Sequence, residues 1–277
     1  MAKTWFITGA SSGFGAELAK AIIESGDKVA ATFRKTEQAS SFSQQYNENG
    51  LGVVLDVTQT EKIPVALQQA IDKFGRIDVL VNNAGYGTIG AIEEFSLEEI
   101  RQQMETNFFG AVAVTKAMLP IMREQKSGYI VQISSQAGFR ATAGFGIYNA
   151  SKFALEGFSE ALAQEVAPFG IKVTIVEPGP FRTQFLAGSM KMPQNKIDLY
   201  KEGPVGYMYQ YQQKMNGNQE GDPVKAAKAI VDYVHSAKEN LRLPLGKVTI
   251  QGMKAKLASV EKDIAANESI AVSTIFQ

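Results

Sequence analysis

Short apolar runs that alternate with longer helical segments restrict the fold of this chain more than any other feature. The runs are rich in Val and Ile, and several are apolar along nearly their whole length, which is typical of strands covered on both faces of a parallel sheet. Between them lie segments with helical periodicity, the first of which places Phe14, Leu18 and Ile22 on one face. Repeated β-α-β units predict an α/β fold with a doubly wound parallel sheet flanked by helices. The expected strands are residues 4–8, 28–33, 52–57, 79–82, 129–134 and 172–177.

Two long helices are expected in the middle of the chain, over residues 96–125 and 151–168. The first of them begins with a capping-box pattern, in which Ser96 is followed three residues later by Glu99. Both helices are flanked by expected strands, so they fit the same alternating pattern.

The C-terminal third of the chain differs from the rest in its sequence pattern. Asp222 and Pro223 predict the N-cap and first residue of another helix. An edge strand is expected over residues 241–246, and a charged helical tail over residues 254–266. We expect one domain over residues 1–277, with residues 252–277 as a C-terminal extension.

The composition excludes several kinds of chemistry. The chain has no cysteine, so thiolate nucleophiles, disulfides and Cys-ligated metals are excluded. Its one histidine, His235, lies in an Ala- and Val-rich helical stretch, and we expect it at the surface or at a helix end. No metal site is expected, and acid/base chemistry must fall to Tyr, Lys, Asp or Glu.

Charge and hydropathy indicate a soluble cytoplasmic protein. Lys+Arg and Asp+Glu are balanced at 28 each, so no net field draws the chain to nucleic acid or to an anionic membrane, and neither partner is expected. The N-terminal apolar run is too short for a signal peptide. The longest apolar stretch, residues 108–120, contains Lys116 and cannot span a bilayer.

A glycine-rich turn joins the first expected strand to the first helix. Its sequence, TGASSGFG, has the spacing G-x-x-x-G-x-G. Glycine permits a tight turn and lets backbone N–H groups approach a pyrophosphate, while the helix N-terminus adds partial positive charge. A glycine triplet alone is weak evidence, but on the first strand of a β-α-β run it predicts a dinucleotide site in a Rossmann fold. The residues expected to contact the cofactor here are Thr8, Gly9, Ser11, Ser12, Gly13, Phe14 and Gly15.

The end of the second expected strand bears on which dinucleotide binds. Proteins that bind NAD usually place Asp or Glu there, where it binds the ribose 2′-hydroxyl. Here Arg34 and Lys35 follow Phe33, and no acid is present. Because a guanidinium offers a planar donor fork to a 2′-phosphate, the sequence favours NADP(H), and a solvated basic turn is the alternative.

Tyr148 and Lys152 are spaced i and i+4, which places them on one helix face. An unperturbed tyrosine has a pKa of about 10, and a nearby ammonium lowers that pKa by favouring the phenolate. Ser135 lies just after the fifth expected strand, where it could hydrogen-bond the oxygen of a carbonyl or alcohol substrate. Among the nine tyrosines only Tyr148 is followed by a lysine four residues later, although such a pair taken alone could be a surface contact.

Seven motifs follow one another through residues 4–183. They are TGASSGFG (8–15), LDVT (55–58), NNAG (82–85), ETNFFG (105–110), ISSQAG (133–138), YNASK (148–152) and EPGPFRT (177–183). In their order and spacing they resemble the short-chain dehydrogenase/reductase family, in its single-domain branch. The stretch YNASKFALEGFSEAL (148–162) also resembles the hydroxysteroid-dehydrogenase-like members of that family.

The resemblance implies four catalytic residues. Tyr148 would be the general acid/base, and Lys152 would lower its pKa and hold the nicotinamide ribose. Ser135 would orient the substrate; its neighbour Ser134 is the alternative, since only one of two adjacent residues points to the site. Asn107 would support a water that links Lys152 to solvent.

The resemblance also implies further cofactor contacts. Arg34 falls where NADP-preferring members carry a basic residue, whereas the other such position, Ser12, is neutral. Asp56 and Val57 would contact the adenine region, although Asp56 could instead be a helix N-cap and Asn82 and Asn83 could merely cap a turn. The remaining expected contacts are Asn83, Ala84, Gly85, Pro178, Gly179 and Thr183, the last to the carboxamide.

Residues 183–221, which we name the lid segment, lie where family members place a substrate-binding lid. The segment is rich in Met and Tyr, which suits an apolar or aromatic ketone, aldehyde or alcohol, with packing under a loop or against another subunit as the alternative. The resemblance further implies a homodimer or homotetramer that pairs the helices around residues 105–125 and 151–168.

The sequence therefore predicts an NADP(H)-dependent oxidoreductase that interconverts a carbonyl and an alcohol on a small-molecule substrate. A non-catalytic NADP(H)-binding sensor is the main alternative, and loss of Tyr148, Lys152 or Ser135 would be its expected mark. A sugar-nucleotide epimerase or dehydratase would share the Tyr/Lys pair, but the glycine spacing and the shorter chain disfavour it.

Overall fold

A parallel sheet lies at the centre of the protein, whose computed structural model describes residues 2–236 and 238–276. Within these residues the sheet has seven strands in the order β3-β2-β1-β4-β6-β7-β9, and all neighbours pair in parallel. This order confirms the predicted α/β fold with a doubly wound sheet. The strands are β1 (Thr4–Ile7), β2 (Lys28–Phe33), β3 (Gly50–Val54), β4 (Val79–Asn82), β6 (Gly128–Ile133), β7 (Ile171–Pro178) and β9 (Arg242–Leu245).

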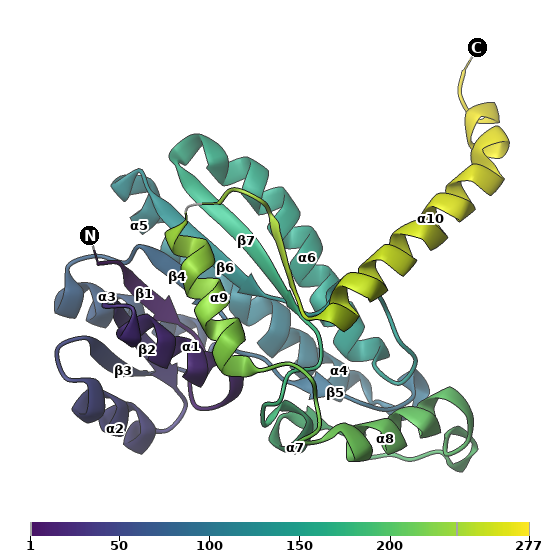
Figure 1. Cartoon of the computed structure of the whole chain (residues 1–277), viewed down its shortest axis with the longest axis horizontal. Helices are drawn as coiled ribbons and strands as arrows, with labels where there is room; N and C mark the ends of the chain where they lie inside the picture. The colour runs from purple at the N-terminus through teal and green to yellow at the C-terminus, as the bar shows by residue number, and fades with distance from the viewer. Residues whose placement is uncertain (1, 237, 277) are drawn as a thin grey trace.

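Helices cover both faces of the sheet (Figure 1). A second, two-stranded sheet pairs β5 (Gly87–Thr88) with β8 (Met190–Lys191). The helices are α1 (Gly13–Glu24), α2 (Thr36–Tyr46), α3 (Ile63–Phe74), α4 (Leu97–Met104), α5 (Gly110–Gln125), α6 (Gly146–Val166), α7 (Phe185–Gly188), α8 (Gly203–Met215), α9 (Pro223–His235) and α10 (Lys247–Ser273).

Adjacent residues of β1 enter two separate cores. Trp5 and Ile7 pack with α1 and α9 on one face, whereas Phe6 packs with α3 and α5 on the other. All three side chains are fully buried. Burial on both faces explains why the strands are apolar along their length and do not alternate with polar residues.

Four predicted elements differ from the structure by more than one residue. The third strand ends at Val54, because the Asp56 carboxylate accepts hydrogen bonds from the N–H and hydroxyl of Thr58 and the chain turns there. The helix expected over residues 96–125 is interrupted by a π-helical turn, Glu105–Phe109. The helix expected over residues 151–168 is α6, which begins five residues earlier, at Gly146. The helical tail expected from residue 254 is α10, which begins at Lys247, two residues after the end of β9.

His235 is the last residue of α9, so its predicted helix-end position is confirmed. Its Nε2 lies 2.6 Å from Oδ2 of the buried Asp27. Asp27 also accepts hydrogen bonds from the Trp5 indole and the Lys3 N–H, both at 2.8 Å. The histidine therefore helps to fasten α9 to the first strand, far from the C-terminal ends of the strands.

Candidate active site

The glycine-rich turn has a backbone that requires its glycines. Gly9 has a φ of +70° and Gly13 a φ of +59°. Both values lie in the left-handed region, which residues other than glycine avoid. A Cβ on Gly9 would lie 2.9 Å from the Ala84 Cα, and one on Gly15 would lie 2.3 Å from the Gly9 carbonyl oxygen. A tight glycine loop leads here straight into the N-terminus of α1, and this arrangement fits the pyrophosphate of a dinucleotide.

The turn between β4 and β5 braces this loop. Asn83 Nδ2 donates to the carbonyls of Thr8, at 3.0 Å, and Gly9, at 2.8 Å. The Thr8 hydroxyl in return accepts the N–H groups of Asn83 and Ala84, both at 3.0 Å. Asn83 therefore holds two loops together and does not merely cap a turn.

Arg34 and Lys35 lie at the C-terminal end of β2, and both are exposed. Thr32 connects this end of the strand to the glycine loop, since its hydroxyl accepts the Gly9 N–H at 3.0 Å and its carbonyl accepts the Ala10 N–H at 2.9 Å. Neither basic side chain takes part in an ion pair within residues 2–236 and 238–276. The two cations are thus free to meet a phosphate beside the loop.

Two other expected adenine contacts lie near this end of the sheet. Asp56 stays partly exposed, and its carboxylate accepts hydrogen bonds from Thr58. The short helix that follows begins at Thr60, and its N-cap residue is Gln59. Asp56 is therefore not the helix N-cap of the alternative interpretation. Val57 is buried, and a Cβ on Gly110 would lie 2.6 Å from its Cγ2, so its side chain packs under the first residue of α5.

Tyr148 lies in the first turn of α6 with only 8% of its surface exposed. Its ring is flanked by Phe145, with centroids 6.4 Å apart, and by Phe185 of α7, at 5.7 Å. Neither aromatic neighbour was predicted, because each comes from a segment without a motif. Together they shield the phenol from solvent.

The Ser135 hydroxyl lies close enough to the phenol of Tyr148 to work to lower its pKa. The same hydroxyl accepts the Ala137 N–H at 3.1 Å. The loop that carries Ser135 is fastened to α6 by Asn149, whose Nδ2 donates to the Ala137 carbonyl at 2.8 Å. Ser134 points elsewhere, since its Oγ would lie 2.5 Å from a Cβ on Gly138.

Burial shifts the pKa of both expected proton-carrying groups. It raises the pKa of Tyr148 to about 12, and Ser135 offsets only part of that rise. It lowers the pKa of Lys152 to about 8, against the charge of Glu156, which works to raise it. The predicted lowering of the Tyr148 pKa by Lys152 is not found in this arrangement, because the Lys152 ammonium donates to the Ile133 carbonyl at 2.8 Å and stands 6.0 Å from the ring centroid of Tyr148.

Asn107 lies in the π-helical turn between α4 and α5, a feature often found at functional sites. Its Oδ1 accepts the Tyr86 N–H at 3.0 Å, and its Nδ2 donates to the Tyr86 carbonyl at 2.9 Å and to Ser151 Oγ at 3.1 Å. A Cβ on Gly85 would lie 3.1 Å from Asn107 Oδ1 and 3.8 Å from Lys152 Nζ. Gly85 thus leaves open the space that separates Asn107 from the Lys152 ammonium.

The end of β7 brings the last predicted residues to the same place. The Pro178 carbonyl lies 3.5 Å from the Ser135 hydroxyl, and the Gly179 N–H donates to the Leu245 carbonyl at 3.0 Å. Thr183 faces the glycine loop, since its Cβ is 3.7 Å from the position of a Cβ on Gly13. The structure therefore brings the predicted cofactor and catalytic residues to the carboxyl end of one sheet.

The lid segment is tied to the short helix Ile92–Glu94 and to α4. The buried Glu94 carboxylate accepts the Ile197 N–H at 3.0 Å and the Tyr209 hydroxyl at 3.1 Å. Burial works to raise the pKa of Glu94. The hydrogen bonds from Ile197, Ala91 and Tyr209, together with the charge of Lys196, outweigh this effect and hold the pKa below its ordinary value. An ionised, fully hydrogen-bonded Glu94 is thus the main polar attachment of this segment.

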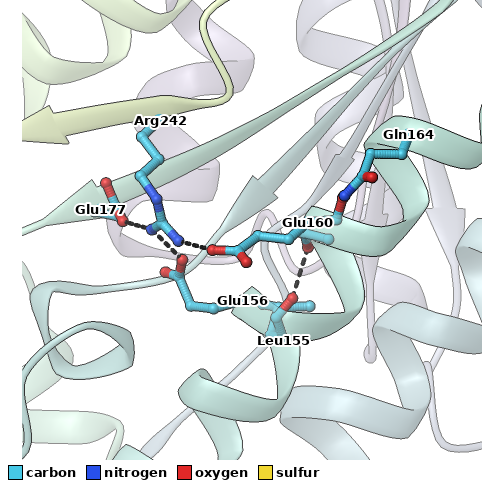
Figure 2. Close-up of polar contacts among 7 residues, drawn as sticks. Leu155, Glu156, Glu160, Gln164, Glu177 and Arg242 are labelled. Carbon is cyan, nitrogen blue, oxygen red and sulfur yellow. Dashed lines mark hydrogen bonds and ion pairs between the residues drawn. The ribbon is translucent and has the colours of Figure 1, made fainter. Parts of the chain in front are cut away.

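A four-residue cluster joins α6, β7 and β9, and we name it the Arg242 cluster (Figure 2). The Arg242 guanidinium pairs with Glu156, Glu160 and Glu177. Glu156 and Glu177 are 6% and 0% exposed. Burial and the charge of Glu156 raise the pKa of Glu177 to about 7, although Arg242 works to lower it. One cation thus faces three carboxyl groups, and Glu156 among them lies one helical turn from Lys152.

We expect the stability of the protein to fall as the pH rises from 5 to 8. Folded Glu177 keeps its proton up to a pH of about 7, whereas the unfolded side chain loses it near 4.5. Its contribution is therefore complete below the unfolded pKa and is lost as the pH rises through the folded one, by at most about 3 kcal/mol. Urea unfolding across this pH range measures the slope, which Glu177→Gln should flatten; a variant with the wild-type slope would contradict the assignment.

Comparison with known proteins agrees with this geometry. A family model described as short chain dehydrogenase matches residues 3–194. Oxidoreductase BOA17 from Botryotinia fuckeliana (strain B05.10) is 39% identical over 266 residues, which cover 95% of this chain and 96% of that protein. A 3-ketodihydrosphingosine reductase from Bacteroides thetaiotaomicron is 48% identical over 179 residues, 65% of this chain and 64% of that protein.

Solved structures have the same fold. A short-chain dehydrogenase from Streptomyces avermitilis superposes with a TM-score of 0.91 and 43% identity over 99% of this chain and all of the other. ElxO with NADP bound has a TM-score of 0.72 and 27% identity, over 91% of this chain and 100% of its own. A 3-ketoacyl-(acyl-carrier-protein) reductase from Brucella melitensis, complexed with NADH, has a TM-score of 0.74 and 26% identity, over 88% and 96%.

Proposed function

The chain belongs to the short-chain dehydrogenase family, and we propose that it is an NADP(H)-dependent oxidoreductase that interconverts a carbonyl and an alcohol, with Tyr148 as general acid/base. Membership of the family makes it an oxidoreductase that acts on a CH–OH/C=O group. The observation that carries the finer proposal is the constellation on α6. Tyr148 and Lys152 share one face of that helix, the Ser135 hydroxyl lies against the phenol, and the glycine loop opens at the same end of the sheet.

The residues of this site would divide the work of carbonyl reduction. Ser135 would hydrogen-bond the carbonyl oxygen of the substrate, and Tyr148 would donate its phenolic proton to that oxygen. When bound, NADPH supplies the hydride that the carbonyl carbon accepts. A pKa raised to about 12 keeps the phenol protonated at neutral pH, which is the state that an acid needs.

Lys152 would support the phenolate that remains after proton transfer. Its ammonium is on the same helix face, and a positive charge nearby stabilises the anion. Because burial lowers the pKa of Lys152 to about 8, it would also exchange protons near neutral pH. Asn107, held by Tyr86 and Ser151, would support the water through which that exchange reaches solvent.

Arg34 and Lys35 support NADP(H) over NAD(H). They are exposed beside the loop without an ion-pair partner among the described residues, and no carboxylate follows β2 to bind a 2′-hydroxyl. The two neighbours described above were solved with NADP in one case and NADH in the other, so the preference rests on the basic pair of this chain.

Arg34→Ala should weaken NADPH binding about tenfold to a hundredfold and change NADH binding by less than about twofold. A charge-assisted hydrogen bond to the 2′-phosphate is worth about 1.5–3 kcal/mol, and NADH carries an uncharged 2′-hydroxyl there, so it has no such bond to lose. Fluorescence titration of both cofactors measures the effect. Lys20→Ala removes an exposed cation from the far part of α1 and should change neither affinity; an equal loss of both affinities in Arg34→Ala would refute the assignment.

The substrate would be an apolar or aromatic small molecule. Phe145 and Phe185 flank the Tyr148 ring, the lid segment to which Phe185 belongs is rich in Met, and one relative is a reductase of 3-ketodihydrosphingosine. A homodimer or homotetramer, formed through α5 and α6, and a cytoplasmic location complete the proposal. None of the described helices is both long and apolar enough to cross a membrane.

A further inference from the structure

The C-terminal helix α10 projects from the body of the protein (Figure 1). It runs over 27 residues, which corresponds to a length of about 40 Å. Within it only Thr249 and Gly252 are buried, and every residue from Lys254 to Ser273 is exposed. A helix with no packed face is stabilised by little more than its intrinsic propensity, so this length of exposed helix indicates a missing partner.

An apolar stripe follows the helix at heptad spacing. Its members are three and four residues apart in alternation, which keeps them on one seam suited to a second helix. Four of them are exposed to between 38% and 64% of their surface, and Met253 is partly exposed. The stripe consists of Ile250, Met253, Leu257, Val260 and Ile264.

The charges that flank the stripe change sign along the helix. Lys254 and Lys256 border its first half, and Glu261 and Asp263 occupy the same two positions one heptad later. None of these four side chains takes part in an ion pair within the part of the chain that the structure describes. The charges beside the stripe are therefore complementary to those of a second α10 that runs in the opposite direction.

We propose that α10 pairs in antiparallel orientation with α10 of a second copy of this chain. With the two-fold axis between residues 258 and 259, Leu257 of one copy packs on Val260 of the other, and Lys254 and Lys256 face the Glu261 and Asp263 of the other. A parallel pair fits less well, because it sets Asp263 beside Glu268 of the second copy.

The same register accounts for the apolar end of the helix. Residue 270 of one copy lies level with residue 247 of the other, where α10 leaves the body of that copy. The exposed side chains of Ile270, Ile275 and Phe276 therefore meet the body of the second copy. This contact surface is separate from α5 and α6, so it adds an interface to any that those helices form.

Charge reversal tests the pairing in the full-length protein. By light scattering after gel filtration, Lys254→Glu/Lys256→Glu should halve the mass of the wild-type assembly, and so should Glu261→Lys/Asp263→Lys. An equimolar mixture of the two variants should recover the original mass, since each supplies the charges that the other lacks. Lys262→Glu, on the opposite side of the helix, should leave the mass unchanged. Variants that keep the wild-type mass would overturn the proposal.

Single cysteines test the direction, because the natural chain contains none. Asn267 of one copy should lie beside Ile250 of the other, so a mixture of Ile250→Cys and Asn267→Cys should form mixed disulfide dimers on oxidation. Each variant alone should not cross-link, because like positions are about 25 Å apart. Cross-linking of each variant with itself would indicate a parallel pair and contradict the proposal. Binding of a monomeric chain to anionic vesicles would likewise contradict it.

Discussion

Tyr148→Phe should lower kcat by about 10²- to 10⁴-fold, the range that a general acid contributes, and leave the affinity for NADPH within about twofold. The substitution removes one oxygen atom. The ring keeps its contacts with Phe145 and Phe185, so α6 and the glycine loop should stay in place. Steady-state kinetics and a fluorescence titration of NADPH measure the two quantities.

Tyr129→Phe is the matched control. The Tyr129 hydroxyl is also buried and hydrogen-bonded, to Thr174 at 2.8 Å and to the Lys238 carbonyl at 3.1 Å, but it lies near the start of β6, at the opposite end of the strand from Ser135. Tyr129→Phe should lower the free energy of unfolding somewhat and leave kcat unchanged. Retained turnover in Tyr148→Phe would refute the role of the phenol, whereas a joint loss in both variants would point to a general effect of losing a buried hydroxyl.

Arg242→Met should destabilise the protein by about 3–5 kcal/mol, because breaking a buried ion pair leaves its charges without compensation. Glu156 and Glu177 would then stand as neighbours in the interior with no cation between them (Figure 2). Urea unfolding at pH 8, where both carboxyls are under the strongest pressure to ionise, measures the loss.

Two comparisons sharpen this prediction. The loss should shrink at pH 5, because the raised pKa of Glu177, about 7, lets that carboxyl take up a proton and become neutral. It should also shrink in Arg242→Met/Glu177→Gln, which removes one of the orphaned charges. A loss below about 1 kcal/mol, the value typical of an exposed pair, would show that the cluster is solvated and not buried.

The fold could be predicted from the sequence because its strands have local signals. Residues such as Trp5, Phe6 and Ile7 are buried on both faces of the sheet, which produces an unbroken apolar run that alternating strands lack. The boundaries were less predictable where a side chain turns the chain, as Asp56 does by binding Thr58. The π-helical turn at Asn107 has no local signature at all, because its partners Tyr86 and Ser151 are distant in sequence.

The candidate site could be predicted only as far as its motifs reach. Glu156 was within reach, since it continues the Tyr148–Lys152 face by another four residues. Arg242 was not, because it meets Glu156 and Glu177 across 86 and 65 residues of chain and only the sheet order brings them together. The protonation state of Tyr148 also escaped prediction, because burial and the direction of the Lys152 ammonium decide it.

The consumption of NADPH with a panel of apolar ketones and aldehydes tests the central claim most directly. We expect at least one carbonyl to drive NADPH oxidation with formation of an equal amount of alcohol, faster with NADPH than with NADH, and the reaction to cease in Tyr148→Phe. A protein that binds NADPH tightly but oxidises it with no member of a broad panel would contradict the account and favour a non-catalytic cofactor sensor.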